Sequence, residues 1–512
     1  MWTKLQNRHF SYFLNLWHLN LLDNRPYNKA EVINKKRRGM EKTSKPPKII
    51  QGGMGVNISD WFLARTVSML GQQGTVSGVA LEKVLSRILQ RGDPGGHIRR
   101  ALSHFPFPRV AEKVLSTFYV EGGISKEAPF RSTPVFSIKP SNLLIALTIC
   151  ANYSFVWLAK EGHENPVSIN YLEKVAMPHV YAITGAILAD VDFITMGAGI
   201  PLQIPGVIND IVEGKTASYR ISVIGKNITS YTISFNPREF FGGELPPIKR
   251  PGFIPIIASN LLASIFMKKL PEGNIDGFVI EGSTAGGHNA PPRKIIQNER
   301  GEPQPIYGKK DEVNYPLMAK IGLPFWIGGS YASPEKLKWA LEVGATGIQA
   351  GSIFALCEES AMDSEIKKKI RRLGFEDKLN IKTDMLISPT GFPFKVVMLD
   401  GTISEPRIYE DRIRICNQGA LVSLYEMPDG TIGYRCASEP VDRYTSKGGD
   451  EADTLGRGCL CNGLISTAGL GDYGEAPVVT LGDDVSFLQK IMANAQSSYS
   501  ARDAIKFLLG NK

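Results

Sequence analysis

The sequence predicts a closed (βα)8 barrel of parallel strands with insertions and a C-terminal α+β extension, an α/β fold. Three observations predict it: eight short apolar runs, helix-period segments after most of them, and glycine-rich turns where several runs end. Parallel strands are buried on both faces and therefore read as continuous apolar runs. An open, doubly wound sheet is the alternative, but its G-x-G-x-x-G signature is absent after the first run.

The eight expected strands are spread along the first two thirds of the chain. They cover residues 49–54, 74–77, 167–170, 193–196, 254–259, 275–281, 323–327 and 347–350. A helix is expected at 61–70, and another begins after Ser333, which is a suitable N-cap followed by Pro334. At 512 residues the chain exceeds an ordinary barrel of roughly 250, so insertions and an appendage must account for the rest.

Three parts are expected along the chain: a basic extension over residues 1–46, the barrel over 47–361, and a C-terminal extension over 362–512 that packs on the barrel. The barrel carries two insertions. Residues 81–166 include helical segments around 82–90 and 110–119. Residues 215–250 include a β-hairpin with its turn near 225–227, because apolar and polar residues alternate on both sides of it. Turn signals mark residues 389–391 and 428–430 of the extension.

The net charge of +9 is concentrated at the N-terminus. Residues 1–49 hold eleven Lys and Arg against three Asp and Glu, which leaves a net charge of only +1 for the remainder. A near-neutral folded part argues against a nucleic-acid partner. No run of 18 uninterrupted apolar residues follows and no signal peptide is recognisable, so we expect no membrane segment and a cytoplasmic location. We expect Met40 to be the true start and residues 1–39 a mis-called extension, with a disordered basic arm or a targeting segment as the alternative.

The strongest chemical signal follows the sixth expected strand, at Ala285-Gly286-Gly287-His288. Glycines lack a Cβ and let the backbone approach a ligand closely. His288 then places a titratable imidazole at the carboxyl end of a strand, where barrels locate their chemistry. The alternative is a tight turn with a surface histidine. Four other histidines lack such a context and are expected to be ordinary surface or core residues: His97, His104, His163 and His179.

Two further strand ends carry glycines, Gly328-Gly329 and Gly351-Ser352. Free backbone N–H groups at such ends can bind phosphate without a lysine. In (βα)8 barrels the loops after the last two strands form a phosphate site of this kind. The sequence therefore predicts a phosphate site here, although each pair alone would be an ordinary turn.

Four separated motifs together resemble the nitronate monooxygenases, FMN-dependent barrel enzymes formerly called 2-nitropropane dioxygenases. The motifs are residues 51–55 (Gln-Gly-Gly-Met-Gly), 285–288, 328–329 and 349–352 (Gln-Ala-Gly-Ser). The resemblance covers residues 49–359, and residues 382–394 are similar to a longer subgroup. It also extends to flavin-dependent enoyl reductases, which share the Gly-Gly-His element. The chain departs from both in its size, in Glu281 and at residues 289–293.

The resemblance implies FMN as cofactor and names the residues that would hold it. Backbone N–H groups of the first loop would hydrogen-bond the flavin ring, Asn170 would reach its polar rim, and the glycines after the sixth strand would leave it room. The last two loops would hold its phosphate. The cofactor-binding residues so implied are Gly52, Gly53, Met54, Asn170, Gly286, Gly287, Gly328, Gly329, Gln349, Gly351 and Ser352.

The reaction implied by the resemblance is oxidation of an alkyl nitronate or nitroalkane by O2 to a carbonyl compound and nitrite. His288 would be the catalytic acid–base residue, because an imidazole titrates near neutral pH. Glu281 would either tune His288 or pair with a neighbouring base. Two alternatives stay open: an NAD(P)H-dependent enoyl-thioester reductase, and a flavin-binding subunit of a larger synthase. A homo-oligomer also stays open.

Six cysteines fall unevenly along the chain. Cys150 and Cys357 are single and sit in apolar surroundings, where buried structural thiols are usual. The other four lie in the extension: Cys416, Cys436, Cys459 and Cys461. Four thiols could form a zinc site, but their spacing is irregular and tighter at one point than the usual C-x₂₋₄-C. Plain buried thiols are therefore preferred over a metal, and a reducing compartment makes a disulfide the lesser alternative.

Overall fold

The computed structural model describes residues 46–299, 301–472 and 474–511. The chain divides into two units, residues 1–46 and 47–512, and the description below concerns the second. The expectations for residues 1–39 therefore lie outside the described residues.

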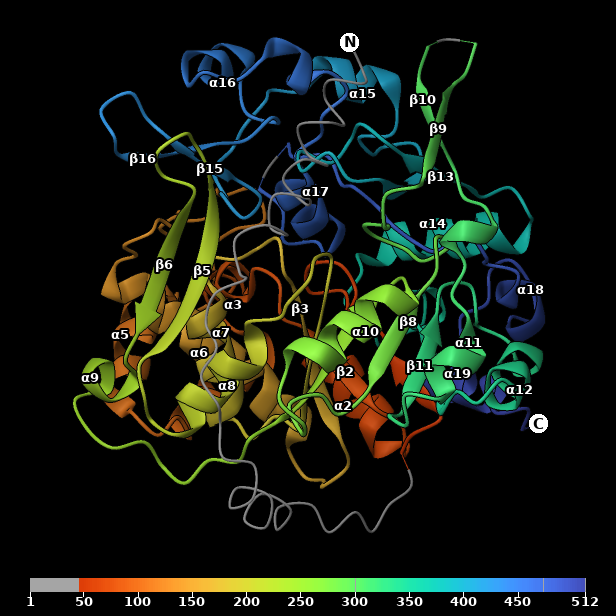
Figure 1. The fold of residues 1–512 in the computed structure, drawn as a ribbon, viewed down its shortest axis with the longest axis horizontal. Helices are drawn as coiled ribbons and strands as arrows, with labels where there is room; N and C mark the ends of the chain where they lie inside the picture. The colour runs from red at the N-terminus through yellow and green to blue at the C-terminus, as the bar shows by residue number, and fades with distance from the viewer. Residues whose placement is uncertain (1–45, 300, 473, 512) are drawn as a thin grey trace. The chain divides into compact units, whose positions relative to one another are not determined.

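A ring of eight parallel strands forms the centre of the second unit (Figure 1). Their order is β1-β12-β11-β8-β7-β4-β3-β2. A parallel bridge between Ile50 and Gln73, with the N–H of Gln51 donating to the Gln73 carbonyl at 2.9 Å, joins the two ends of this order. The predicted barrel is thus confirmed. Its strands are β1 (Ile49–Gln51), β2 (Gly74–Ser77), β3 (Val167–Leu172), β4 (Phe193–Gly197), β7 (Gly252–Ile257), β8 (Phe278–Glu281), β11 (Phe325–Gly328) and β12 (Gly347–Ala350).

All eight expected strands are present, and the differences lie at their ends. The first expected strand extends to residue 54, but β1 ends at Gln51. Beyond it the chain leaves the strand, and the N–H of Met54 donates to the Ser59 hydroxyl at 3.0 Å rather than to a neighbouring strand. The sixth begins at Phe278, three residues later than expected.

Helices follow most strands and cover the outside of the barrel. The expected ones are found at α2 (Trp61–Met69), α3 (Leu81–Gln90), α5 (Pro108–Phe118) and α12 (Pro334–Glu342). The hydroxyl of Ser333 accepts from the N–H of Lys336 at 3.2 Å, so the predicted N-cap is confirmed. The others around the barrel are α4 (His97–Ser103), α7 (His179–Leu188), α8 (Ile204–Val212), α10 (Asn260–Lys269), α11 (Tyr315–Ala319) and α13 (Ser352–Ala355).

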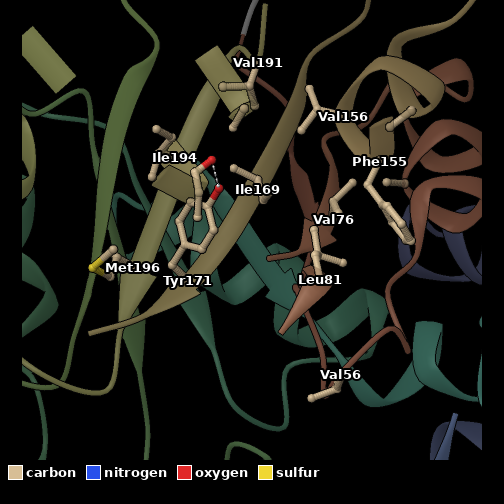
Figure 2. Close-up of a cluster of buried hydrophobic side chains, with 14 of the residues drawn as sticks. Val56, Val76, Leu81, Phe155, Val156, Ile169, Tyr171, Val191, Ile194 and Met196 are labelled. Atoms are coloured by element: carbon tan, nitrogen blue, oxygen red, sulfur yellow. Dashed lines mark hydrogen bonds between the residues drawn. The ribbon is translucent and has the colours of Figure 1, made fainter. Parts of the chain in front are cut away.

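The first insertion contains a helix that the sequence analysis missed, α6 (Asn142–Lys160). Among the described residues, α6 is the single helix that is both long enough and apolar enough to cross a membrane. However, 83% of its most apolar window is buried inside the protein. Figure 2 shows Phe155 and Val156 of α6 beside apolar side chains of the barrel strands, among them Ile169. A helix buried on all sides has no polar face, so it lacks the 3.6-residue pattern that reveals surface helices.

The second insertion and the C-terminal extension share a sheet. The predicted hairpin is confirmed as β5 (Ala217–Ile224) and β6 (Ser230–Phe235), with alternate residues of β5 buried. β15 (Ser423–Glu426) and β16 (Ile432–Arg435) extend it in the order β16-β15-β5-β6. The carboxylate of Glu426 accepts from the N–H groups of Lys226 and Asn227 at 2.8 and 2.9 Å, which fixes the hairpin turn to the extension.

The extension, hereafter the tail (residues 362–512), contributes further elements that run from teal to blue in Figure 1. Both expected turns are confirmed, since the N–H of Gly391 donates to the Ser388 carbonyl and that of Gly430 to the Met427 carbonyl.

A hairpin of β9 (Lys294–Gln297) and β10 (Pro303–Ile306), which leaves the barrel after His288, was not expected. The remaining elements are α9 (Pro237–Phe241) in the second insertion and, in the tail, α14 (Ser364–Phe375), β13 (Asn380–Asp384), β14 (Phe394–Met398), α15 (Pro406–Asp411), α16 (Val441–Ser446), α17 (Leu460–Thr467), α18 (Phe487–Ile491) and α19 (Ala501–Leu508).

Candidate active site

One cavity lies at the carboxyl ends of the barrel strands, and its empty space amounts to about 1830 Å³ including the part open to solvent. Every residue that the sequence analysis expected in catalysis or cofactor binding lines it. They come from five strand ends: Gly52, Gly53 and Met54 after β1, Asn170 in β3, Gly286, Gly287 and His288 after β8, Gly328 and Gly329 at the end of β11, and Gln349, Gly351 and Ser352 at the end of β12. His97, His104, His163 and His179 are not among the lining residues of the described chain.

Three of these glycines border space that the protein does not fill. A Cβ at Gly52, Gly328 or Gly351 would meet its nearest protein atom at 3.5–3.6 Å, an ordinary contact distance. Two others are required by the fold itself: a Cβ at Gly53 would lie 2.4 Å from the Cβ of Asn170, and one at Gly286 would lie 2.9 Å from the Leu481 carbonyl carbon. A side-chain carbon would therefore fit at the ends of β1, β11 and β12, where these glycines line the cavity.

The backbone N–H groups of the first loop, from which hydrogen bonds to a flavin ring were expected, are mostly engaged within the protein. The N–H of Gly52 donates to the Ala350 carbonyl at 2.9 Å, and that of Met54 to the Ser59 hydroxyl. Asn170 also stabilises this loop, since its side-chain N–H donates to the Gly53 carbonyl at 3.1 Å. Pairing with the end of β12 uses the Gly52 donor and the loop itself uses the Met54 donor, so only the N–H of Gly53 is left among these three.

The tail forms one wall of the cavity, which the sequence analysis did not anticipate. Residues 480–484, hereafter the closing segment, run across the glycine-rich loops. The N–H of Gly287 donates to the Thr480 hydroxyl at 2.7 Å, and the N–H of Gly482 donates to the Ser352 hydroxyl at 2.9 Å. At its far end the carboxylate of Asp484 pairs with the ammonium of Lys336 at 2.6 Å. A lysine thus stands beside the expected phosphate position, although its charge is already balanced.

His288 is held by the tail. Its Nε2 lies 2.8 Å from the Ser388 hydroxyl and 3.4 Å from the Thr390 hydroxyl, and its ring packs edge-on against Phe394 with centroids 4.9 Å apart. Burial lowers the pKa of His288 well below its usual value, and the positive charge of Lys174 lowers it further. The imidazole is therefore neutral at neutral pH and is a weak base rather than a cation.

Glu281, the last residue of β8, also lines the cavity. Burial raises the pKa of its carboxyl to about 7, while the nearby charge of Lys174 lowers it. Burial in turn lowers the pKa of Lys174 to about 7. The side chain of Glu281 is partly accessible because it faces the cavity, and it is otherwise enclosed by protein. An enclosed acid that titrates near neutrality is typical of functional sites.

An apolar wall lies where the tail meets the loops after β2 and β3. Leu421, Leu460, Leu464 and Val478 of the tail line the cavity together with Val79, Leu172 and Val175 of the barrel. No short motif marks these tail residues, and their place depends on contacts between segments far apart in sequence. Sequence reasoning therefore had no signal by which to find them.

The cysteines of the chain are all free. Cys150 and Cys357 are buried, as expected. In the tail, the thiols of Cys416 and Cys436 share a hydrogen bond, and Cys461 lines the cavity. Among the described residues no group of three or more His, Cys, Asp or Glu side chains is arranged to hold a metal ion.

Comparisons with known proteins give partial similarities, and no family model matches the chain. The chain is 31% identical over 96 residues to a nitronate monooxygenase from Pseudomonas aeruginosa, which is 19% of this chain and 25% of that protein. It is 23% identical over 197 residues to (3aS,4S,5R,7aS)-5-hydroxy-7a-methyl-1-oxo-octahydro-1H-indene-4-carboxyl-CoA dehydrogenase from Rhodococcus jostii, which is 38% of this chain and 48% of that protein. The chain thus spans about a quarter and about half the length of these relatives, both of which are named for oxidation–reduction reactions.

Solved structures show weak similarity. FabK from Thermotoga maritima has 16% sequence identity and a TM-score of 0.40, with 91% of this chain and 92% of that one covered. Nitroalkane oxidase from Streptomyces ansochromogenes has 11% identity and a TM-score of 0.39, with 91% and 95% covered. The enoyl reductase domain of MlnA from Bacillus amyloliquefaciens has 10% identity and a TM-score of 0.46, with 91% and 94% covered. At these TM-scores the similarity bears on neither the fold nor the function.

Proposed function

We propose that this chain is an FMN-dependent oxidoreductase whose active site is the cavity at the carboxyl end of the barrel. The observation that carries the proposal is the convergence of residues from five strand ends on one cavity, with unfilled space at Gly52, Gly328 and Gly351. Bound FMN would supply the hydride and electron transfer. The loops after β11 and β12 would hold its phosphate, as in other (βα)8 barrels, and the loop after β1 would face its ring.

One reaction for this site is oxidation of alkyl nitronates by O2 to a carbonyl compound and nitrite. The partial identity to a nitronate monooxygenase supports it. The charges around the cavity give it no support, because a nitronate is an anion and the one lysine among the described lining residues is engaged elsewhere. The charged side chains that line the cavity are Glu82, Lys83, Glu281 and Asp484, and the Lys83 ammonium is engaged by the Thr133 hydroxyl and the Pro134 carbonyl.

The second candidate reaction is NAD(P)H-dependent reduction of an enoyl thioester, and the cavity favours it. An enoyl thioester is neutral at its reacting end, so the neutral His288 and the lining acids do not oppose its binding. The apolar wall of Leu421, Leu460 and Val478 can accommodate its hydrocarbon chain. The relative from Rhodococcus jostii is also named for a CoA derivative. A third reading, a flavin-binding subunit of a larger synthase, stays a prediction.

The absorption spectrum of the purified protein tests the cofactor. Flavin bands at about 370 and 450 nm are expected, and a colourless protein that FMN cannot reconstitute would contradict the proposal. Stopped-flow mixing under anaerobic conditions separates the two reactions. Rapid flavin reduction by NADH or NADPH, reversed by an enoyl thioester, would support the reductase. Flavin reduction by a nitronate but not by nicotinamide would support the oxygenase.

A further inference from the structure

We propose that Glu281 is the catalytic acid–base residue of this cavity: its carboxylate removes, or its carboxyl returns, the proton on the carbon next to the substrate's nitro or thioester group. This inference rests on the proposed function. It gives to Glu281 the proton transfer that the sequence resemblance assigns to His288.

The position of Glu281 supports this role. It ends β8, pairs in register with Gly328 of β11, and lines the cavity between the loops expected to hold the cofactor. Within the described residues its carboxylate makes no hydrogen bond and no ion pair. Asp484, another acid on the cavity wall, is by contrast neutralised by Lys336 at 2.6 Å. The Glu281 carboxylate is thus free to contact a substrate.

Lys174 is the positioning residue for Glu281. It follows β3, and its Nζ lies 3.3 Å from the centroid of the Phe392 ring, in the same tail loop that holds His288. No carboxylate in the described chain lies within ion-pair distance of this ammonium, although Glu173 and Glu281 both interact with it electrostatically. Glu173 is itself bonded by the Tyr219 hydroxyl at 3.2 Å. The charge of Lys174 therefore acts across the cavity wall to favour the carboxylate form of Glu281.

His288 is less suited to accept the proton. Its Nε2 is taken up by the hydroxyls of Ser388 and Thr390, and burial together with Lys174 holds its pKa well below the usual value. Glu281 has a pKa of about 7, close to that of an efficient acid or base at neutral pH. We therefore assign His288 to substrate orientation.

The proton transfer needs no oxidant or reductant. The C–H bond beside the nitro or thioester group breaks, an O–H bond forms on Glu281, and the electron pair delocalises onto the nitro or carbonyl oxygen. The reverse step returns the proton. In D2O the same two steps replace the substrate hydrogen by deuterium, which allows the step to be measured without net turnover.

The experiment measures this exchange by NMR, with nitroethane and butyryl-CoA as probes and the FMN-loaded enzyme kept anaerobic. We expect enzyme-dependent exchange with at least one probe, and a loss of about 10² to 10⁴-fold in Glu281→Gln. Glu281→Asp, which keeps the carboxylate, should restore part of the rate. The rate should rise with pH through about 7, as the carboxyl ionises. Lys174→Met should move that rise to higher pH, because a charge that lowers the pKa of Glu281 is removed.

Two results would overturn the inference: exchange in Glu281→Gln within threefold of the wild type, or an unshifted pH profile in Lys174→Met. An FMN titration of each variant separates this inference from the proposed function. If the protein binds FMN but the hydrogen–deuterium exchange rate is the same with and without the Glu281 carboxylate, the inference is contradicted and the proposed function is not. Glu281-dependent exchange in protein that never binds FMN supports the inference and contradicts the proposed function.

Discussion

Gly351→Ala should weaken FMN binding without destabilising the protein. The φ angle of Gly351 is −108°, which alanine adopts freely, and the new methyl group would meet only Met54, at 3.5 Å. We therefore expect the free energy of unfolding of the cofactor-free protein to stay equal or to rise by about 0.4–1 kcal/mol. The methyl group would enter the space assigned to the phosphate. Overfilling a packed site by one carbon costs about 1–3 kcal/mol, which corresponds to an FMN Kd about 5 to 150-fold higher.

Gly53→Ala is the matched control, because the methyl group added at this glycine would clash with the protein instead of entering the cavity. Its Cβ would lie 2.4 Å from the Cβ of Asn170, so Asn170 must move and its 3.1 Å hydrogen bond to the Gly53 carbonyl is disturbed. Overpacking costs about 1–3 kcal/mol and a lost hydrogen bond about 1 kcal/mol more. This variant should therefore lose stability even when no FMN is present.

Urea unfolding of the cofactor-free proteins and fluorescence titration with FMN measure the two effects separately. The reasoning would be refuted if Gly351→Ala bound FMN within twofold of the wild type. It would also be refuted if Gly351→Ala lost as much stability as Gly53→Ala, because the space at the end of β12 would then belong to the fold and not to a ligand.

Three further predictions follow from the site. His288→Ala should keep FMN but lower kcat/KM with the preferred substrate by at least tenfold through lost orientation, and a smaller loss in steady-state assays would remove His288 from the site. Glu281→Gln should be more stable than the wild type at pH 8 but not at pH 4. Burial raises the pKa of the Glu281 carboxyl in the folded protein from 4.5 to about 7. The wild type therefore loses stability as the pH rises through that interval, by at most about 3 kcal/mol, and the glutamine variant does not. Thermal melts at the two pH values test this, and an equal shift at both would contradict it. Cys416 should be alkylated before the buried Cys150 and Cys357, as followed by mass spectrometry. The hydrogen bond from Cys436 lowers the pKa of Cys416, whereas burial raises the pKa values of Cys150 and Cys357. Cys416→Ser should abolish the early label, and simultaneous labelling of all cysteines would argue against the described environment.

The barrel was predictable because its information is local. Apolar runs such as residues 323–327 and 347–350 end in glycines, and parallel strands bring all such ends to the same side. Once the fold was assigned, the meeting of Gly329, Gly351 and His288 followed from the order of the strands alone. The hairpin of β5 and β6 was equally predictable from the sequence, because buried and exposed residues alternate along β5.

The remaining features depend on contacts that no local pattern encodes. α6 escaped notice because burial on every side removes the periodicity of a surface helix. The bond from Gly287 to Thr480 joins residues 193 positions apart. The engagement of the Gly52 and Met54 N–H groups was equally hidden, because a glycine-rich loop indicates close approach of the backbone but not which donors the fold itself consumes.

The closing segment has a consequence for how the protein is made. During synthesis the barrel strands emerge first, and β12 is complete at residue 350, whereas residues 480–484 follow 130 residues later (480 − 350). Until then the glycine-rich loops at the mouth of the barrel lack the segment that runs across them, and incompletely covered apolar surface attracts aggregation and chaperones. A nonsense or frameshift mutation upstream of residue 480 would therefore leave a nascent barrel permanently open. Such mutations should abolish activity because the truncated protein is degraded, and not because its active site is weakened.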